Sequence, residues 1–257
     1  MTLRIATVSL NSAVDQTVTV PGFTADAVNR VAASRSDAGG KGINVASFLA
    51  HAGHGVAVTG LLGAENAALF ARHFAATGLV DACQRLPGAT RTNVKIVDPL
   101  QKQITDLNFP GLAAGPADLD AVAATLTGLL AQGLDWVALC GSLPAGIGAE
   151  AYADLAASGV GLVAVSMGAG GAVLVRGAET VLAIPPVTRI ASTVGAGDAM
   201  VAGLIHAATL GLGLPETARL ATAFSLGALG EIGPHLPPPD SISRLARTVT
   251  VKTLPPV

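Results

Sequence analysis

Short apolar runs alternate with stretches of helical periodicity along most of this chain of 257 residues. LRIATVSL (3–10) and VAVTGLLG (56–63) predict strands, whereas GINVASFLAHAG (42–53) and ALFARHFAATG (68–78) predict helices. This alternation favours an α/β fold, a doubly wound and mostly parallel sheet flanked by helices. Apolar residues make up 51% of the sequence and aromatic residues only 3%, which suits a sheet of Val, Leu, Ile and Ala buried on both faces.

One segment interrupts this rhythm between the first strand and the first helix. Residues 14–38 form a long connection with alternating polar and apolar positions, and TRTNVKIVD (90–98) and QKQITDLNF (101–109) predict a hairpin. We expect a single α/β domain over residues 1–257, with 14–38 and 91–109 forming a small β lid. The alternative is a surface hairpin without a function.

Charge and cysteine content exclude several classes of protein. The net charge is −2 and no basic block occurs, so we expect no nucleic-acid partner. Cys83 and Cys140 are the only cysteines, which excludes a disulfide framework and favours a reduced, cytoplasmic setting. The charge-free stretch 155–175 contains five glycines, which favours strand-turn-strand over a membrane span. No signal peptide is evident.

The stretch STVGAGDAMVAGLIHA (192–207) places an acid at the start of an apolar helix. Backbone N–H groups at a helix N-terminus can hold a phosphate, and Gly195, Ala196 and Gly197 would let it approach closely. A carboxylate beside a phosphate is unfavourable unless Asp198 accepts the proton of an attacking hydroxyl. The alternative is an acid that only stabilises its helix, by about 0.3–1 kcal/mol.

A second glycine-rich turn, DAGGKGINVA (37–46), also precedes a helix. It is not a Walker A loop, because Arg35 occupies the first glycine position and Gly42 follows the lysine. The turn with Lys41 and Asn44 could hold a polyhydroxylated or phosphorylated substrate, or it could be an ordinary turn.

Other polar residues lie where ligands bind in α/β proteins. Arg91, Asn93 and Lys95 share one face of an extended strand and could bind a dianion, although a solvated edge strand is the alternative. Asp15 follows the first strand and could bind sugar hydroxyls, and Ser142 in CGSLP (140–144) could contact substrate. The five histidines show no metal-ligand spacing.

Taken together, AGGKGINVA, TRTNVKI, LNFPG, CGSLP, SMGAGGAVLV and STVGAGDAMVAGLI resemble, in this order, the ribokinase-like sugar kinases and within them the 1-phosphofructokinase group. The resemblance implies a transferase that uses ATP and Mg²⁺ to phosphorylate fructose 1-phosphate, as a homodimer formed through the lid. It implies Asp198 as catalytic base and Gly195, Ala196 and Gly197 as anion hole. The implied substrate contacts are Asp15, Gly39, Gly40, Lys41, Asn44, Arg91, Asn93, Lys95 and Ser142. The implied nucleotide contacts are Ser166, Gly168, Thr193, Gly195 and Gly197.

The chain departs from the family pattern near residues 157–162, where two strand–helix units, about 50–60 residues, are missing. The missing part carries an Asn-x-x-Glu element that the family associates with magnesium and phosphate, so the metal ligands stay unassigned. Ser12 also replaces a usual proline. Two alternatives follow: an impaired or inactive homologue that binds sugar phosphate, or a kinase of tagatose 6-phosphate or fructose 6-phosphate.

Overall fold

The computed structural model describes residues 3–144, 162–188, 190, 195–231 and 235–254. The expected helix at 148–159, most of the region 157–162 and Thr193 lie outside the described residues. The chain divides into two compact units. The N-terminal unit comprises Ile5–Ile43 and Ala57–Ala149, and the C-terminal unit comprises Met1–Arg4, Asn44–Val56 and Glu150–Val257.

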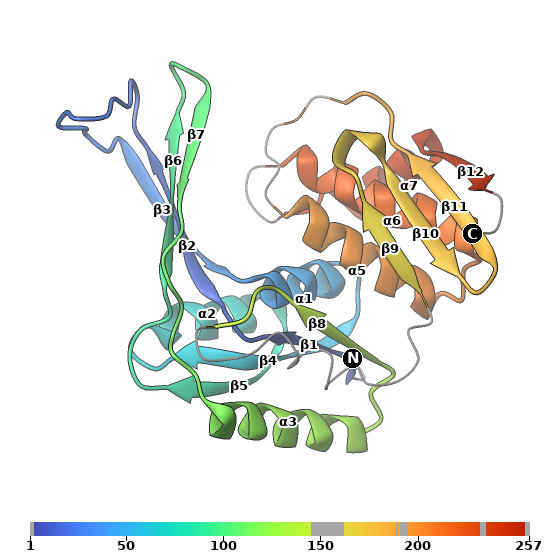
Figure 1. The fold of residues 1–257 in the computed structure, drawn as a ribbon, viewed down its shortest axis with the longest axis horizontal. Coiled ribbons are helices and arrows are strands. Elements are labelled where there is room, and N and C mark those ends of the chain that lie inside the picture. The colour runs from blue at the N-terminus through green and yellow to red at the C-terminus, as the bar shows by residue number, and fades with distance from the viewer. Residues whose placement is uncertain (1–2, 145–161, 189, 191–194, 232–234, 255–257) are drawn as a thin grey trace. The chain divides into compact units, whose positions relative to one another are not determined.

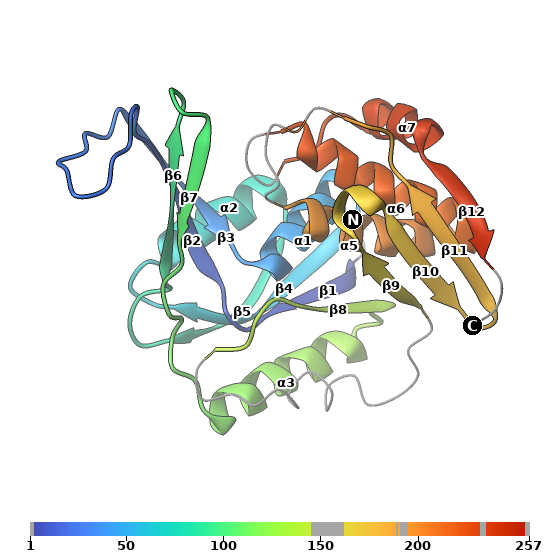
Figure 2. The same ribbon diagram turned by 45° about the horizontal axis from the view of Figure 1, so that its top comes forward.

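A four-stranded sheet of order β5-β4-β1-β8 forms the centre of the N-terminal unit (Figure 1). β4 and β5 pair in parallel, as do β1 and β8, and α2 and α3 lie on opposite faces of the sheet (Figure 2). Val8, Val58 and Leu62 are fully buried in its strands. The elements are β1 (Leu3–Ser9), β4 (Gly55–Gly63), α2 (Ala67–Thr77), β5 (Val80–Leu86), α3 (Pro116–Ala131) and β8 (Trp136–Cys140).

A second four-stranded sheet in this unit has the order β3-β2-β6-β7. β2 pairs in parallel with β6, while β2 with β3 and β6 with β7 are antiparallel hairpins. To within one residue, the strands lie in the two segments 14–38 and 91–109. They are β2 (Ala13–Thr19), β3 (Ala33–Gly39), β6 (Thr92–Asp98) and β7 (Gln103–Leu107).

The buried carboxylate of Asp98 joins two turns of this second sheet. It accepts hydrogen bonds from the backbone N–H groups of Gly22, Phe23, Leu100 and Gln101, at 2.8–3.2 Å. Burial acts to raise the pKa of Asp98, but these four bonds outweigh it and the pKa is lowered. The ionised carboxylate therefore holds the two turns together.

The C-terminal unit contains an antiparallel sheet of order β12-β11-β10-β9. α6 packs against β10, β11 and β12, and both α5 and α7 pack against α6 (Figure 1). A side chain at Gly203 of α5 would come within 2.7 Å of the Ala221 Cα in α6, so glycine allows these helices to approach closely. The elements are β9 (Val163–Ser166), β10 (Ala172–Arg176), β11 (Glu179–Ile184), α5 (Ala196–Thr209), α6 (Leu214–Leu229), α7 (Pro239–Thr248) and β12 (Thr250–Leu254).

The fold class is α/β, as expected, with helices covering the parallel sheet. In the C-terminal unit the antiparallel pairing of β9 with β10 follows from a short connection, because the turn from Met167 to Gly171 joins these strands and cannot support a parallel crossover. The sequence did not predict β5, β11 or β12. Among the helices that the structure describes, none is long and apolar enough to cross a membrane.

Candidate active site

Helix α5 in the C-terminal unit begins as the STVGAGDAMVAGLIHA stretch predicts. Gly195 precedes it with φ of 81°, a left-handed conformation that glycine adopts without strain. A Cβ placed on Gly197 would meet no atom within 4 Å, so space remains beside the first turn. Asp198 follows in that same turn and is only 6% exposed. A buried carboxylate thus adjoins backbone N–H groups that can hold an anion.

A buried amide contacts this carboxylate. Asn44 lies in the first turn of α1 (Lys41–His51), in the part of the helix that belongs to the C-terminal unit. Its Nδ2 donates a hydrogen bond of 2.8 Å to Oδ2 of Asp198. The residues are 154 positions apart in the sequence, so periodicity gave no signal for this contact.

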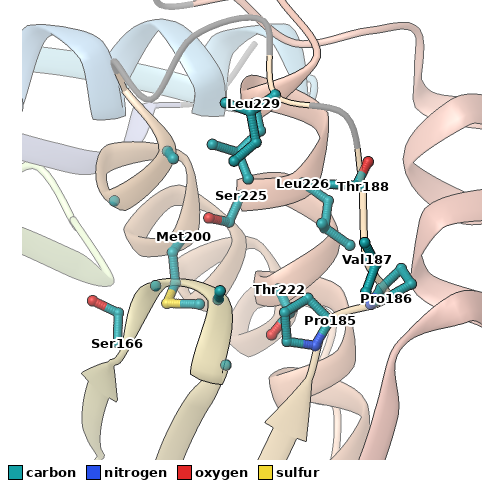
Figure 3. A pocket seen from close by; sticks show the side chains of 16 residues that line it. Ser166, Pro185, Pro186, Val187, Thr188, Met200, Thr222, Ser225, Leu226 and Leu229 are labelled. Carbon is teal, nitrogen blue, oxygen red and sulfur yellow. The ribbon is translucent and has the colours of Figure 1, made fainter.

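A cavity of about 450 Å³ adjoins the start of α5 (Figure 3). Four of the predicted site residues line it, namely Ser166, Gly168, Ala196 and Gly197. None of the described residues that line the cavity has a charged side chain. The other lining residues are Ala169, Gly171, Pro185, Pro186, Val187, Thr188, Ile190, Met200, Thr222, Ser225, Leu226 and Leu229.

The sequence analysis did not identify the cavity-lining residues that lie on α6. Thr222, Ser225, Leu226 and Leu229 follow helical spacing, which is equally typical of residues packed into a core. The Oγ1 atom of Thr222 is buried and has no hydrogen-bond partner among the described residues. A buried hydroxyl without a partner is costly and is often explained by a group that the coordinates do not contain.

The second sheet of the N-terminal unit, β3-β2-β6-β7, places the predicted acid and amide at paired positions. Asp15 lies opposite Asp37 on β3 and opposite Asn93 on β6. Asn93 Nδ2 is 3.4 Å from Asp15 Oδ1, and the Asn93 Oδ1 accepts a hydrogen bond from the Phe109 N–H. Burial raises the pKa of Asp15, while Asn93 and the nearby charges of Lys95 and Arg91 oppose that rise.

The two cations predicted to bind a dianion already have protein partners. The Arg91 guanidinium donates to the carbonyl oxygens of Asn11, Ser12 and Phe109, at 3.0–3.3 Å. Lys95 forms an ion pair with Asp106 across β6 and β7. A guanidinium has five N–H donors, so Arg91 can hold the loop after β1 and still bind an anion.

The glycines of DAGGKG have a packing reason as well as a possible binding role. A Cβ on Gly39 would overlap the Asp15 carboxylate, and one on Gly42 would come within 2.8 Å of the Val8 carbonyl oxygen. Gly40 has φ of 118°, which other residues rarely adopt. These glycines let the turn lie against the end of β1.

Further predicted residues meet beyond the carboxyl ends of β1 and β8, where ligands bind in open α/β sheets. Asn11 Nδ2 donates to the Ser142 Oγ at 3.1 Å and to the Leu143 carbonyl at 3.2 Å. A Cβ on Gly141 would lie 3.5 Å from the Cβ of Lys41, the first residue of α1. The predicted sugar-side residues, apart from Asn44, therefore gather in one unit, and Asp198 with the cavity belongs to the other.

Comparison with protein families shows which family the chain belongs to. The model of the pfkB family carbohydrate kinases matches residues 5–156 and 135–240. The chain belongs to the pfkB carbohydrate kinase family. The family expected from the motifs is thereby confirmed.

Two relatives and one solved structure illustrate this pfkB membership. The chain is 76% identical to a 1-phosphofructokinase of Rhodobacter capsulatus over 316 aligned positions, covering 100% of both chains. It is 36% identical to a 1-phosphofructokinase of Xanthomonas campestris, covering 99% of this chain and 100% of that one. The structure of a possible 1-phosphofructokinase from Thermotoga maritima has a TM-score of 0.83 at 21% identity, covering 98% and 99%, and supports the fold.

The lengths of these pfkB proteins differ from that of this chain. The Rhodobacter alignment has 316 positions but this chain has 257 residues, so at least 316 − 257 = 59 aligned positions have no residue here. Among the residues that the structure describes, no group of three or more His, Cys, Asp or Glu side chains could hold a metal ion.

Proposed function

We propose that the protein transfers the γ-phosphoryl group of ATP to the free primary hydroxyl of fructose 1-phosphate, giving fructose 1,6-bisphosphate and ADP. The observation that carries this proposal is Asp198, a buried acid in the first turn of α5, in a chain 76% identical to a 1-phosphofructokinase. Ala196 and Gly197 of the same turn line the cavity. A merely helix-stabilising acid gains nothing from burial.

In the proposed reaction, the side chain and the backbone N–H groups at the start of α5 have different roles. The sugar hydroxyl oxygen attacks the γ-phosphorus, the bond to the bridging oxygen of ADP breaks, and Asp198 accepts the hydroxyl proton. The backbone N–H groups at Gly195, Ala196 and Gly197 stabilise the charge on the transferring group. We expect Thr193, just before this turn, to contribute to the nucleotide site.

The cavity is the proposed site for the nucleotide base and ribose. Its volume of about 450 Å³ and uncharged lining suit a flat, weakly polar ring. Ser166 and Gly168 line it from the sheet side, and Thr222 offers a buried hydroxyl without a partner among the described residues. The phosphates would extend toward Ala196 and Gly197.

We propose that the N-terminal unit holds the sugar phosphate. Asp15 and Asn93 would bind sugar hydroxyls, while Arg91, Lys95 and Lys41 would bind the phosphate already on the sugar. Gly39, Gly40 and Ser142 would contribute close backbone or hydroxyl contacts. Asn44, whose amide donates a hydrogen bond to Asp198, would also contact the sugar.

The metal and the assembly are further parts of the proposal. Mg²⁺ commonly binds through one or two carboxylates together with substrate phosphates, so it would enter with ATP rather than occupy a site made by the protein alone. The second sheet, β3-β2-β6-β7, would act as the lid and pair with the lid of a second copy. Exposed Val28, Leu100 and Ile104 on its strands and turns support such pairing.

An ADP-release assay with purified protein tests this function. Fructose 1-phosphate, fructose 6-phosphate and tagatose 6-phosphate are compared side by side, with and without Mg²⁺. We expect turnover that depends on Mg²⁺ and is fastest with fructose 1-phosphate. Faster turnover of either 6-phosphate would assign the protein to that substrate instead.

The second candidate function is binding of sugar phosphate without turnover. It is supported by the 59 or more family positions that have no residue in this chain, which fits the loss of two strand–helix units near 157–162. Calorimetry that detects sugar-phosphate binding, with no ADP formed under any divalent metal, would favour this candidate over the kinase.

A further inference from the structure

We propose that Asn11 is a positioning residue of the sugar-phosphate site, which holds the Ser142 hydroxyl in the orientation that donates a hydrogen bond to the ligand. The inference rests on the proposed function, in which the N-terminal unit binds the sugar phosphate and Arg91 and Ser142 are among its contacts. It goes beyond that function because it names the residue that connects these two contacts.

The side chain of Asn11 contacts the loop that follows β8. Its Nδ2 donates to the Ser142 Oγ at 3.1 Å and to the Leu143 carbonyl oxygen at 3.2 Å. Since a carbonyl oxygen can only accept, the amide must direct its NH₂ group, and not its oxygen, toward this loop. Ser142 is therefore the acceptor in its hydrogen bond with Asn11.

This bond decides what the Ser142 hydroxyl can offer a ligand. A serine hydroxyl has one hydrogen and two lone pairs, so a hydroxyl that accepts from Asn11 keeps its hydrogen for another partner. Ser142 is exposed, so a ligand can reach that hydrogen. The oxygens of an ionised phosphate only accept hydrogen bonds, and a donor is what such a ligand needs.

The backbone of Asn11 is joined to the second predicted contact. Arg91 Nη2 donates to the Asn11 carbonyl oxygen at 3.0 Å, and Arg91 Nε donates to the Ser12 carbonyl oxygen at 3.3 Å. Arg91 immediately precedes β6, whereas Ser142 follows β8. Asn11 thus connects, through its backbone and its side chain, a guanidinium and a hydroxyl from distant parts of the sequence.

Gly111 leaves the space that this amide occupies. A Cβ on Gly111 would overlap the Asn11 Oδ1, although the backbone of Gly111 is not in the left-handed region. Oδ1 is buried and has no hydrogen-bond partner among the described residues. A buried acceptor without a partner is costly, so the contacts of the NH₂ group, and not those of the oxygen, account for an amide at this position.

Calorimetric titration of the protein with fructose 1-phosphate tests the inference. Asn11→Ala should raise the Kd about 5- to 10-fold, as expected for the loss of hydrogen bonds of ordinary strength, while KM for ATP stays within about twofold. In a Ser142→Ala background the same substitution should raise the Kd less than about twofold, because the hydroxyl that Asn11 orients is absent.

Gln84→Ala is the matched control for the loss of an amide. Gln84 Nε2 on β5 donates to the Thr125 Oγ1 on α3 at 2.8 Å, which is also a hydrogen bond from an amide to a hydroxyl. Its loss should leave the Kd for fructose 1-phosphate unchanged.

Gly111→Ala tests the same role without removing a polar group. The added methyl group would overlap the Asn11 Oδ1 and displace the amide, so the Kd should rise as it does in Asn11→Ala. In the Asn11→Ala background the space is free, and adding Gly111→Ala should raise the Kd by no more than about a further twofold. Thermal unfolding of every variant checks that the fold persists.

The outcomes are distinct. An unchanged Kd in Asn11→Ala, or the same rise with and without the Ser142 hydroxyl, would overturn the inference and leave the kinase function standing. A rise in KM for ATP as large as the rise in Kd for the sugar phosphate would show a general structural role and overturn the inference too. If the unaltered protein neither binds fructose 1-phosphate nor forms ADP with it, the proposed function fails and the inference fails with it.

Discussion

In the N-terminal unit the candidate functional residues include charged side chains that contact other protein groups, whereas the C-terminal unit offers a cavity lined by uncharged described residues and a buried carboxylate. Arg91 contacts three carbonyl oxygens, Lys95 pairs with Asp106, and Asp15 lies beside Asn93. Asp198 accepts a hydrogen bond from the amide of Asn44. In the part of the chain that the structure describes, the cavity lining carries no charged side chain.

This difference matches the two ligands proposed for the two units. A sugar phosphate is small, highly charged and rich in hydroxyls, so fixed charges and fixed amides recognise it best. A nucleotide base is flat and weakly polar, so shape and apolar surface contribute most of its binding. Substitutions in one unit should therefore change the KM of one substrate only, and substitutions at Asp198 should change kcat.

The largest expected effect is on Asp198. Replacing it with Asn preserves its size but removes the proton acceptor, so kcat should fall about 10²–10⁴-fold, as is usual for loss of a general base. The measurement is single-turnover or steady-state ADP release at saturating substrates.

The control for that substitution is Asp118→Asn. Asp118 also lies in the first turn of a helix, where it accepts a hydrogen bond of 2.8 Å from the Gly115 N–H. Its loss should lower stability by about 0.3–1 kcal/mol through the helix terminus and leave kcat unchanged. Equal kinetics in the two variants would mean that Asp198 only stabilises its helix.

The second largest expected effect is the weaker binding of the sugar phosphate when Arg91 is replaced. Hydrogen bonds to charged groups contribute about 1.5–3 kcal/mol, so Arg91→Lys, which loses the two-pronged geometry, should raise KM for the sugar phosphate about 10-fold or more. KM for ATP should stay within about twofold. Arg85→Lys, on an arginine paired with Asp81 on β5, is the matched control and should change neither KM. A rise in the KM for ATP alone would reverse the assignment of the units.

A third effect concerns the cavity. Ser225 lines it from α6, and Ser225→Phe would fill part of its volume of about 450 Å³. We expect KM for ATP to rise about 10-fold while KM for sugar phosphate is unchanged, since one blocked apolar contact is worth about 1–3 kcal/mol. Ser225→Ala, which leaves the space open, should behave like the unaltered protein. A selective loss of sugar-phosphate affinity in Ser225→Phe would contradict the proposed nucleotide site.

The sequence predicted local features better than it predicted contacts between distant segments. The helix after Gly197, the β9–β10 turn and the hairpin of β6 and β7 each depend on neighbouring residues, and the structure has all three. The partner of Asn44 is 154 positions away, and nothing in its helix distinguishes an amide facing a sugar from one facing Asp198.

The cavity lining also depends on contacts between distant segments, which the sequence does not reveal. Thr222, Ser225 and Leu226 have the spacing of a buried helix face, and only the position of the neighbouring strands decides whether that face is filled or left open. The partners of Arg91 were hidden for a similar reason, because backbone carbonyls of a turn leave no trace in residue type.

The smallest expected effect is on the pH dependence of stability. It concerns the C-terminal unit alone, because His54 and His206 both belong to that unit. Burial lowers the pKa of both rings, helped by Arg4 for His54 and by His54 for His206. The unfolded chain therefore binds protons at a higher pH than the folded one does, and stability falls as pH drops below the ordinary histidine value of about 6.5.

His206→Gln removes one of these two groups and should flatten the dependence of Tm on pH between about 7 and 5, by no more than a few degrees, since solvent screens partly exposed rings. The unaltered protein is the reference for this slope. Thermal unfolding followed by circular dichroism at several pH values measures both. A steeper dependence of Tm on pH in His206→Gln would mean that the His206 ring is charged in the folded protein. The contact between His54 and His206 would then not be one between two neutral rings.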